Sequence, residues 1–320
     1  MSTIPGNYIP IRQFDHGHLL QREALNYDSM IIHSRLREFQ KQVPDSGLSI
    51  KLAVAGQEHY EIGSRSYTVS PEQYLVVNRH QSFECHFQSR EIVEAFCLYI
   101  GPDIVQEVQA HLQAPEILQT DEAEASPGGE LRFFENTFRL GDNPLGLFLE
   151  KLRYRLLHHA PPSGQLPEAA FFRLSELLIR HQSQVARQID RLPSAKPATR
   201  EELFRRLSIA HSYIHDHYRD PIQLEQVSRA AAVSKFHLLR TFKTVYGITP
   251  YQLVLQLRLQ AAKTMLGQDR KLEEIAFDLG FSDRRAFTKA YKKAFGRPPA
   301  FARATAGQRP PSLSYGETKS

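Results

Sequence analysis

The sequence predicts an α+β protein of two domains, a β-rich domain with added helices followed by an all-α domain. Three observations favour this fold class. Short alternating apolar runs fill the first hundred residues, apolar residues at helical spacing fill the rest, and residues 222–303 contain one pattern twice. At 320 residues, 41% hydrophobic and 23% charged, the chain is long enough for two separate cores.

The repeated pattern predicts two helix-turn-helix units. Apolar, serine, glycine and proline positions of the first copy recur 48 or 49 residues later. The first set is Leu224, Val227, Val233 and Ser234, matched by Leu272, Ile275, Phe281 and Ser282. The second set is Leu238, Phe242, Gly247 and Pro250, matched by Phe287, Tyr291, Gly296 and Pro299. Each copy therefore reads as a short helix, a tight turn and a second helix.

Turn and cap residues support this interpretation. Ser234 and Ser282 have the side chain of an N-cap and precede the two second helices. Gly280 suits a turn that needs positive φ, and Gly247 and Gly296 end the second helices.

The second helices each combine an apolar face with a basic open face. We expect the buried faces to be Leu238, Phe242 and Val245 in the first helix and Phe287, Tyr291 and Ala294 in the second. The open faces hold the candidate DNA contacts Lys235, Phe236, Leu239, Arg240, Lys243, Arg284, Arg285, Thr288, Lys289, Lys292 and Lys293. A solvated helix face can also be charged, but the repeated capped architecture favours DNA binding.

This stretch resembles the DNA-binding domain of the AraC/XylS family of bacterial transcription regulators. The first copy matches at Ser234, Leu238, Arg240, Phe242, Lys243, Gly247, Thr249, Pro250, Arg258 and Ala262. The second matches at Ile275, Ala276, Gly280, Phe281, Phe287, Lys292, Lys293, Phe295, Gly296, Pro299 and Arg303. Tyr291 departs from the phenylalanine usual in the family. The resemblance covers about the last third of the chain and implies an all-α double helix-turn-helix domain.

The resemblance also implies roles for single residues. It places base contacts at Phe236, Leu239, Arg240, Arg285, Thr288 and Lys289. Their chemistry agrees, because arginine donates to guanine in a bidentate way and apolar side chains suit thymine methyl groups. Lys243, Lys292 and Lys293 lie nearer the helix ends and are expected to contact phosphates.

Charge is distributed unevenly along the chain. Residues 199–303 contain 19 Lys+Arg against 10 Asp+Glu, whereas the remainder contains 21 against 25. A basic block attached to a mildly acidic body is typical of a nucleic-acid-binding domain joined to a second domain.

We predict the following domain organisation. An effector-binding and dimerisation domain spans 1–192, β-rich over 1–100 and helical over 101–192. A linker at 193–199, a DNA-binding domain at 200–303 and a loose tail at 304–320 follow. Within the DNA-binding domain we expect helices over 201–217, with Leu203, Leu207, Ala210 and Ile214 inward, and over 250–266. The latter, capped by Thr249 and with Leu253, Leu257 and Ala261 inward, is about 25 Å long and spaces the two reading helices about 34 Å apart.

The first hundred residues predict many short strands. These lie within 49–54, 60–62, 67–69, 75–77, 83–87 and 93–100. The family commonly has a cupin-like jelly roll here, which binds a small effector. Inward residues such as Leu52, Val54, Tyr60, Ile62, Tyr67 and Val76 are equally well explained by core packing. Phe14, Arg35 and Arg37 are further, weaker candidates for effector contact.

Helical spacing begins after residue 101. We expect helices over 103–112 and 144–159, another beginning at Pro167, and an acidic loop over 121–130. The last two helices either cover the sheet or, as the family implies, build a dimer interface.

A metal-dependent cupin enzyme is a remote alternative. His16–His18 precedes the strands, His215–His217 lies in the helical region, and His33, His59, His80 and His86 are scattered. We therefore expect no enzyme activity, metal or cofactor. Cys85 and Cys97, in segments that we interpret as neighbouring strands, are expected to act as small hydrophobes.

The resulting hypothesis is a ligand-responsive transcription regulator in the cytoplasm, since neither a long apolar run nor a charged-then-apolar leader occurs. Expected partners are double-stranded DNA, an unidentified small effector, a second copy in a homodimer and, as a candidate, RNA polymerase; no membrane is expected. A regulator controlled by a protein partner is the alternative. The effector, the operator and the direction of control, activation or repression, do not follow from the sequence.

Overall fold

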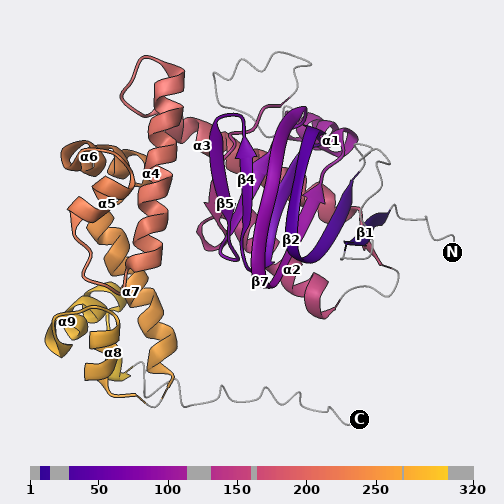
Figure 1. The fold of residues 1–320 in the computed structure, drawn as a ribbon. Helices are drawn as coiled ribbons and strands as arrows, with labels where there is room; N and C mark the ends of the chain where they lie inside the picture. The colour runs from indigo at the N-terminus through magenta and orange to yellow at the C-terminus, as the bar shows by residue number, and fades with distance from the viewer. Residues whose placement is uncertain (1–7, 15–28, 114–130, 160–163, 269, 302–320) are drawn as a thin grey trace, which may run out of the picture. The chain divides into compact units, whose positions relative to one another are not determined.

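A computed structural model describes residues 8–14, 29–113, 131–159, 164–268 and 270–301. The chain forms two compact units, Met1–Arg187 and Gln188–Ser320 (Figure 1). The expected acidic loop at 121–130, the histidines of 16–18 and the tail at 304–320 lie outside the described residues.

The first unit contains a nine-stranded sheet with the path β8-β6-β3-β7-β2-β1-β9 and a β4–β5 hairpin attached to β7. The strands are β1 (Tyr8–Phe14), β2 (Met30–Ser46), β3 (Ser49–Ala55), β4 (Glu58–Ile62), β5 (Arg65–Val69), β6 (Gln73–Val77), β7 (Gln81–Tyr99), β8 (Thr137–Arg139) and β9 (Gln165–Pro167). All pair antiparallel except β1 with β2. The predicted strands 49–54, 60–62, 67–69 and 75–77 are confirmed as β3, β4, β5 and β6, with bounds that differ by one or two residues.

Two parts of the sheet differ from the prediction. The segments 83–87 and 93–100 belong to one long strand, β7, so Cys85 and Cys97 share a strand and do not lie on neighbours. The long strand β2 was not predicted, because most of its side chains beyond Leu36 are polar or exposed. It is held by its ladder with β7, which runs from Met30↔Tyr99 to Ser46↔Gln81 with two irregularities.

The sheet has a different apolar cluster on each face. One cluster includes Ile50, Leu52 and Phe96 and packs against helices, while the other includes Ala53, Tyr60 and Val93. Because β-strand side chains alternate between faces, neighbours along β3 contribute to different clusters. The expected inward set is therefore divided: Leu52 and Val76 belong to the helix-facing cluster, with Val54 packed against it, while Tyr60, Ile62 and Tyr67 belong to the other.

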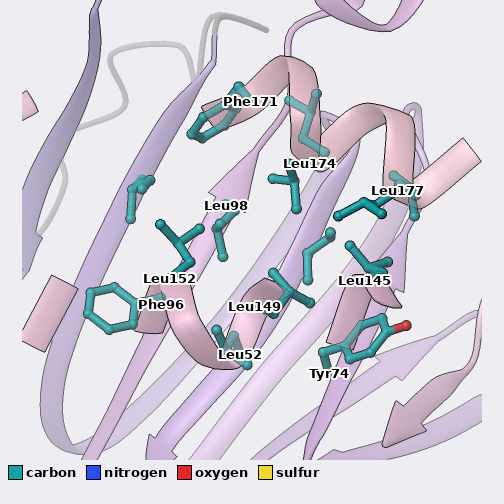
Figure 2. Close-up of a cluster of buried hydrophobic side chains, with 14 of the residues drawn as sticks. Leu52, Tyr74, Phe96, Leu98, Leu145, Leu149, Leu152, Phe171, Leu174 and Leu177 are labelled. Carbon is teal, nitrogen blue, oxygen red and sulfur yellow. The ribbon is translucent and has the colours of Figure 1, made fainter. Parts of the chain in front are cut away.

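Helices of the first unit cover one face of the sheet. They are α1 (Pro102–Gln113), the 3-10 turn η1 (Leu140–Asp142), α2 (Pro144–His158) and α3 (Ala169–Asp190). The three predicted helices are confirmed, except that Pro167 ends β9 and the third helix begins at Ala169. Figure 2 shows leucines of α2 and α3 pointing toward side chains of the sheet. Leu145, Leu149, Phe171 and Leu174 are completely or almost completely buried there, so the predicted role of these helices in covering the sheet is confirmed.

The second unit is helical. Its helices are α4 (Pro197–His217), α5 (Leu224–Ala230), α6 (Lys235–Tyr246), α7 (Pro250–Leu266), α8 (Leu272–Asp278) and α9 (Arg284–Phe295) (Figure 1). The four apolar residues expected inward on α4 are all buried. On α7 Leu253 is buried, but Leu257 and Ala261 are only partly buried, and Leu259 and Ala262 take the inner positions instead.

The linker prediction needs correction at its end. Residues 197–199 form the first turn of α4, where a proline at the start of the helix loses no hydrogen bond. Arg200 then donates to the carbonyl oxygen of Ser194 at 2.9 Å and to Asp190 at 3.1 Å, which orders the residues before the helix. Among the described residues, no helix is both long and apolar enough to cross a membrane.

Candidate nucleic-acid interface

The first helix-turn-helix motif is built by α5, a short turn and α6. Ala232 has φ of 51°, which is unusual for a residue with a side chain and marks the tight point of the turn. The Val233 amide donates to the carbonyl of Ser228 at 3.0 Å. The predicted N-cap is confirmed, since the hydroxyl of Ser234 accepts from the His237 amide at 3.4 Å.

The second motif, α8 and α9, turns at Gly280, whose φ is 73° as predicted. Its cap corrects the prediction. The carboxylate of Asp283, and not the hydroxyl of Ser282, accepts from the Ala286 amide, at 2.7 Å. This hydrogen bond lowers the pKa of Asp283, because it favours the charged form.

Both second helices end at the predicted glycines. Gly247 and Gly296 have φ of 73° and 75°, and their amides donate to the carbonyls of Lys243 and Lys292 at 2.9 and 2.8 Å. The left-handed conformation, which glycine adopts without strain, thus stops α6 and α9 at equivalent points.

The buried faces are mostly as expected. Leu238, Phe242 and Val245 of α6 and Phe287 and Tyr291 of α9 are all buried. Ala294 is exposed, which corrects its assignment to the buried face. The burial of α9 ends one turn earlier than the repeat predicts.

Arg258 of α7 joins the chain after α4 to the turn of the second motif. Its guanidinium donates to the carbonyls of Tyr218 at 2.6 Å, Gly280 at 2.5 Å and Asp220 at 2.8 Å. It also lies 5.7 Å from the centre of the Phe281 ring. One side chain therefore ties the turn of the second motif to the end of α4. The sequence matched Arg258 to the family pattern but gave no sign of this role.

The open faces present the predicted contact residues to solvent. Lys235, Phe236, Arg240, Lys243, Arg284, Arg285, Lys289, Lys292 and Lys293 are exposed, and Leu239 and Thr288 are partly buried. Phe236 is 86% exposed. A phenylalanine side chain that stays in water gives up the favourable free energy of burying its apolar surface. An exposed aromatic side chain among basic residues is consistent with a surface that binds another molecule.

Two of these cations are held by acids from the preceding helix. Lys235 Nζ lies 2.5 Å from Glu225 Oε1, and Arg284 Nη1 lies 2.7 Å from Glu273 Oε1. The hydrogen bond from Lys235 lowers the pKa of Glu225. The pKa of Glu273 is lowered by a backbone hydrogen bond and by Arg284. These exposed pairs occupy part of the charge that Lys235 and Arg284 offer at the starts of the second helices. The repeat pattern described above does not include these two glutamates, although they are 48 residues apart like its other positions.

Comparison with known proteins agrees with this geometry. A family model described as "Helix-turn-helix domain" matches residues 227–305, from α5 to beyond α9. The regulatory protein SoxS of Escherichia coli K12 is 30% identical over 90 residues, which are 28% of this chain and 84% of SoxS. The chain belongs to the AraC/XylS family of transcription regulators.

Further relatives are similar over different lengths. The HTH-type transcriptional regulator YbfI of Bacillus subtilis strain 168 is 26% identical over 229 residues, 72% of this chain and 74% of that protein. A solved transcriptional regulator from Chromobacterium violaceum, described as containing an AraC-type DNA-binding domain, is 28% identical. It aligns with 33% of this chain and 95% of its own, with a TM-score of 0.31. The predicted family membership and two-part fold class of this AraC/XylS protein are confirmed.

The first unit contains a second candidate site, a cavity of about 100 Å³ within the curved sheet. Its lining includes Phe14 and Tyr60 from the predicted candidates, but not Arg35 or Arg37, which are exposed on β2. The lining is Phe14, Ile32, Ser34, Leu36, Phe39, Lys41, Val43, Lys51, Glu58, Tyr60, Phe83, Cys85, Phe87, Cys97 and Tyr99. The polar groups that line this cavity come from strands distant in the sequence, so no local motif indicates that they lie together.

Each of the histidines that lie scattered over the strands contacts a neighbouring side chain. His33 lies 2.7 Å from Glu94, His59 lies 3.1 Å from Thr68, and His80 lies 3.1 Å from Asp45. The rings of His59 and His86 are 5.7 Å apart. These contacts give each of the four a structural partner on the strands.

Proposed function

We propose that this AraC/XylS regulator binds a single DNA duplex with both motifs, placing α6 and α9 in successive major grooves. The observation that carries the proposal is the duplication of the whole motif. Each second helix has a capped N-terminus, a left-handed glycine at its end and an exposed basic face. A helix with these features fits the width of a major groove.

The exposed residues divide into two proposed roles. Phe236, Leu239, Arg240, Arg285, Thr288 and Lys289 contact base edges. Lys243, Lys292 and Lys293 bind phosphates near the helix ends, while Lys235 and Arg284 hold the helix starts in place and add positive charge. Contacts to bases decide which sequence is bound, whereas contacts to phosphates raise affinity for any duplex.

We further propose that a small effector bound in the cavity of the first unit controls DNA binding. The cavity combines aromatic and aliphatic walls with polar groups such as those of Lys51 and Glu58, which could orient a ligand. An effector changes DNA binding only if its affinity differs between two states of the protein. A homodimer, in which two copies bind neighbouring sites, and contact with RNA polymerase complete the proposal, and the protein works in the cytoplasm, where bacterial DNA lies.

The experiment that tests DNA reading is selection of duplexes from a random pool by the purified full-length chain. Enrichment of a bipartite motif with two elements about one helical turn apart supports two reading helices. Enrichment of a single element contradicts the role of one motif, and an unchanged pool contradicts both.

The experiment that tests effector control is thermal unfolding of the full chain against a panel of small metabolites. A ligand at 100 times its Kd stabilises the unit that binds it by about 2.7 kcal/mol. Metal analysis of the purified protein tests the enzyme alternative, which requires a stoichiometric metal that the regulatory role does not.

A further inference from the structure

The ammonium group of Lys51 is buried in the first unit. Lys51 lies on β3 and is 3% exposed, although a lysine charge is costly to remove from water. Its Nζ lies 4.6 Å from the ring centre of Phe83 and 4.8 Å from that of Tyr99. Ring faces offset part of the cost of burial through cation–π attraction, but they do not neutralise the charge.

The Lys51 ammonium donates to a cysteine sulfur where a carboxylate would usually be its partner. The ladder between β3 and β7 places Lys51 directly opposite Cys97, and Nζ donates to Sγ at 2.9 Å. Among the described residues, no carboxylate forms an ion pair with this ammonium. An ammonium in contact with a thiol favours the thiolate, which is the nucleophilic form of cysteine.

The acid that lines the same cavity, Glu58, has a hydrogen-bond partner of its own. Glu58 is also buried, and its Oε2 accepts from the Tyr60 hydroxyl at 3.0 Å. Burial raises the pKa of Glu58, which favours the neutral acid. Burial lowers the pKa of Lys51, but its interactions with Cys97, which accepts its hydrogen bond, and with Tyr99 more than offset this, so that the net shift is upward.

The other cysteine provides a contrast in the same chain. Cys85 lies on the same strand and lines the same cavity, but it is buried, and the Lys51 ammonium donates its hydrogen bond to Cys97 instead. Burial raises the pKa of Cys85, so its thiol stays protonated. Cys97 is only partly buried, and both cysteines are free thiols.

The cavity gives small molecules a route to the sulfur. Its lining contains both Lys51 and Cys97, and it also contains Lys41, which is exposed and therefore marks where the cavity reaches the surface. A volume of about 100 Å³ with aromatic walls suits a compact, largely apolar molecule.

We propose that Cys97 and Lys51 form a covalent capture site for small α,β-unsaturated carbonyl compounds. The Cys97 thiolate attacks the β-carbon, a sulfur–carbon bond forms, and the π electron pair of the carbon–carbon double bond moves to the α-carbon. That carbon takes a proton from the Lys51 ammonium. The products are a saturated thioether and a neutral amine, with no leaving group and no oxidant.

The surroundings favour this reaction because the Lys51 ammonium donates to the Cys97 sulfur and stabilises the negative charge that the attack requires. After the proton transfer the buried Lys51 side chain is a neutral amine, which an apolar cavity tolerates better than an ammonium. The regulatory consequence of capture rests on the proposed effector control of DNA binding, whereas the chemistry of the site does not.

The test is intact-mass spectrometry and peptide mapping of the full-length protein after exposure to methyl vinyl ketone. We expect one adduct, at Cys97 and not at Cys85, in the native protein, and both cysteines labelled in urea. Butanone, which has the carbonyl but no double bond, should give no adduct. Preferential native labelling of Cys85, or equal labelling of the two, overturns the proposal.

Two variants test the part played by the ammonium. Lys51→Met should slow adduct formation by at least about tenfold, because the thiolate loses its partner. Lys263→Met is the matched control, since Lys263 also lies over a ring, 4.3 Å from the centre of Phe295, but is remote from the cavity in sequence and lies in the other unit. Equal rates in Lys51→Met and wild type contradict the proposal. If Lys51→Met does not fold, the contrast between native and unfolded wild type decides.

DNA binding by the modified protein separates this proposal from the proposed function. An adduct at Cys97 that leaves selected-DNA affinity unchanged refutes effector control through this cavity but supports the capture site. Specific DNA binding without any adduct refutes the capture site alone.

Discussion

Arg284 and Glu273 form an ion pair, 2.7 Å between Nη1 and Oε1, that repeats the pair of Lys235 and Glu225 in the first motif. Each pair joins the first turn of one helix to the start of the next. The acid lies where a helix N-terminus favours negative charge, so it is well placed to hold the cation. Both motifs thus fix the start of the proposed reading helix in the same way.

Replacing the acid should release charge toward DNA. Glu273→Gln is expected to leave the urea unfolding midpoint nearly unchanged, because exposed ion pairs contribute little to stability. Affinity for random duplex should rise, by less than about tenfold, because one more cation becomes available to phosphates. Glu107→Gln, an exposed acid on α1, is the control in fluorescence anisotropy titrations. Equal affinities for both variants and wild type would contradict a DNA-facing position for Arg284.

Gly280 should be less replaceable than Gly296. Both have positive φ, but a Cβ at Gly280 would lie 2.3 Å from the Arg219 carbonyl oxygen and 2.7 Å from Arg258 Nη2, whereas nothing lies within 4 Å at Gly296. We expect Gly296→Ala to cost about 1 kcal/mol and Gly280→Ala about 3 kcal/mol or more. Chemical unfolding of the two variants measures this difference. Similar losses would mean that the contacts of Arg258 do not constrain the turn.

The second unit could be predicted closely from sequence because its signals are local. Helical spacing, a capping side chain and a closing glycine all lie within about fifteen residues of one another, and the repeat allowed each copy to support the other. The error at the second cap arose because Ser282 and Asp283 are adjacent and both can cap a helix. Only the geometry shows that the Asp283 carboxylate reaches the Ala286 amide.

The first unit was less predictable because its structure depends on distant partners. β2 carries many polar residues and pairs with residues far along the chain, from Met30 with Tyr99 to Ser46 with Gln81. Lys51 lies in a run whose alternation predicts a strand, yet nothing local indicates that a lysine there is buried against Cys97. Strand propensity depends strongly on such surroundings, so long-range pairs escape local patterns.

The proposed division between base and phosphate contacts gives a third prediction. Arg240→Ala should cost about 1–3 kcal/mol on the selected sequence and broaden the range of sequences bound. Lys292→Ala should weaken selected and random duplexes alike and reduce the slope of log affinity against log salt by about one. Titrations of both variants on both duplexes at several salt concentrations check this. Equal losses on both duplexes for both variants would refute the division.

His181 should make the first unit sensitive to acid. Its ring packs 4.8 Å from Phe138, and neither of its nitrogens has a partner among the described residues. Burial lowers its pKa to about 4, whereas an unfolded histidine has a pKa near 6.5. The unfolded state therefore binds a proton first, and stability falls as pH drops from about 6.5 to about 4, by about 3 kcal/mol in total.

Urea unfolding of the wild type and of His181→Phe at pH 7 and pH 4.5 checks this effect. The variant should lose less stability between the two pH values, because it lacks the titrating group. An equal loss in both proteins would show that His181 is protonated as easily in the folded state as in the unfolded state.

The central claim is that α6 and α9 bind one duplex together. Hydroxyl-radical footprinting of the full-length chain on a duplex selected by it tests this most directly. We predict two protected regions on one face of the duplex, about 34 Å apart, with Arg240→Ala weakening one and Arg285→Ala weakening the other. A single protected region that only one of the two variants alters, or no protection at physiological salt, would contradict the claim.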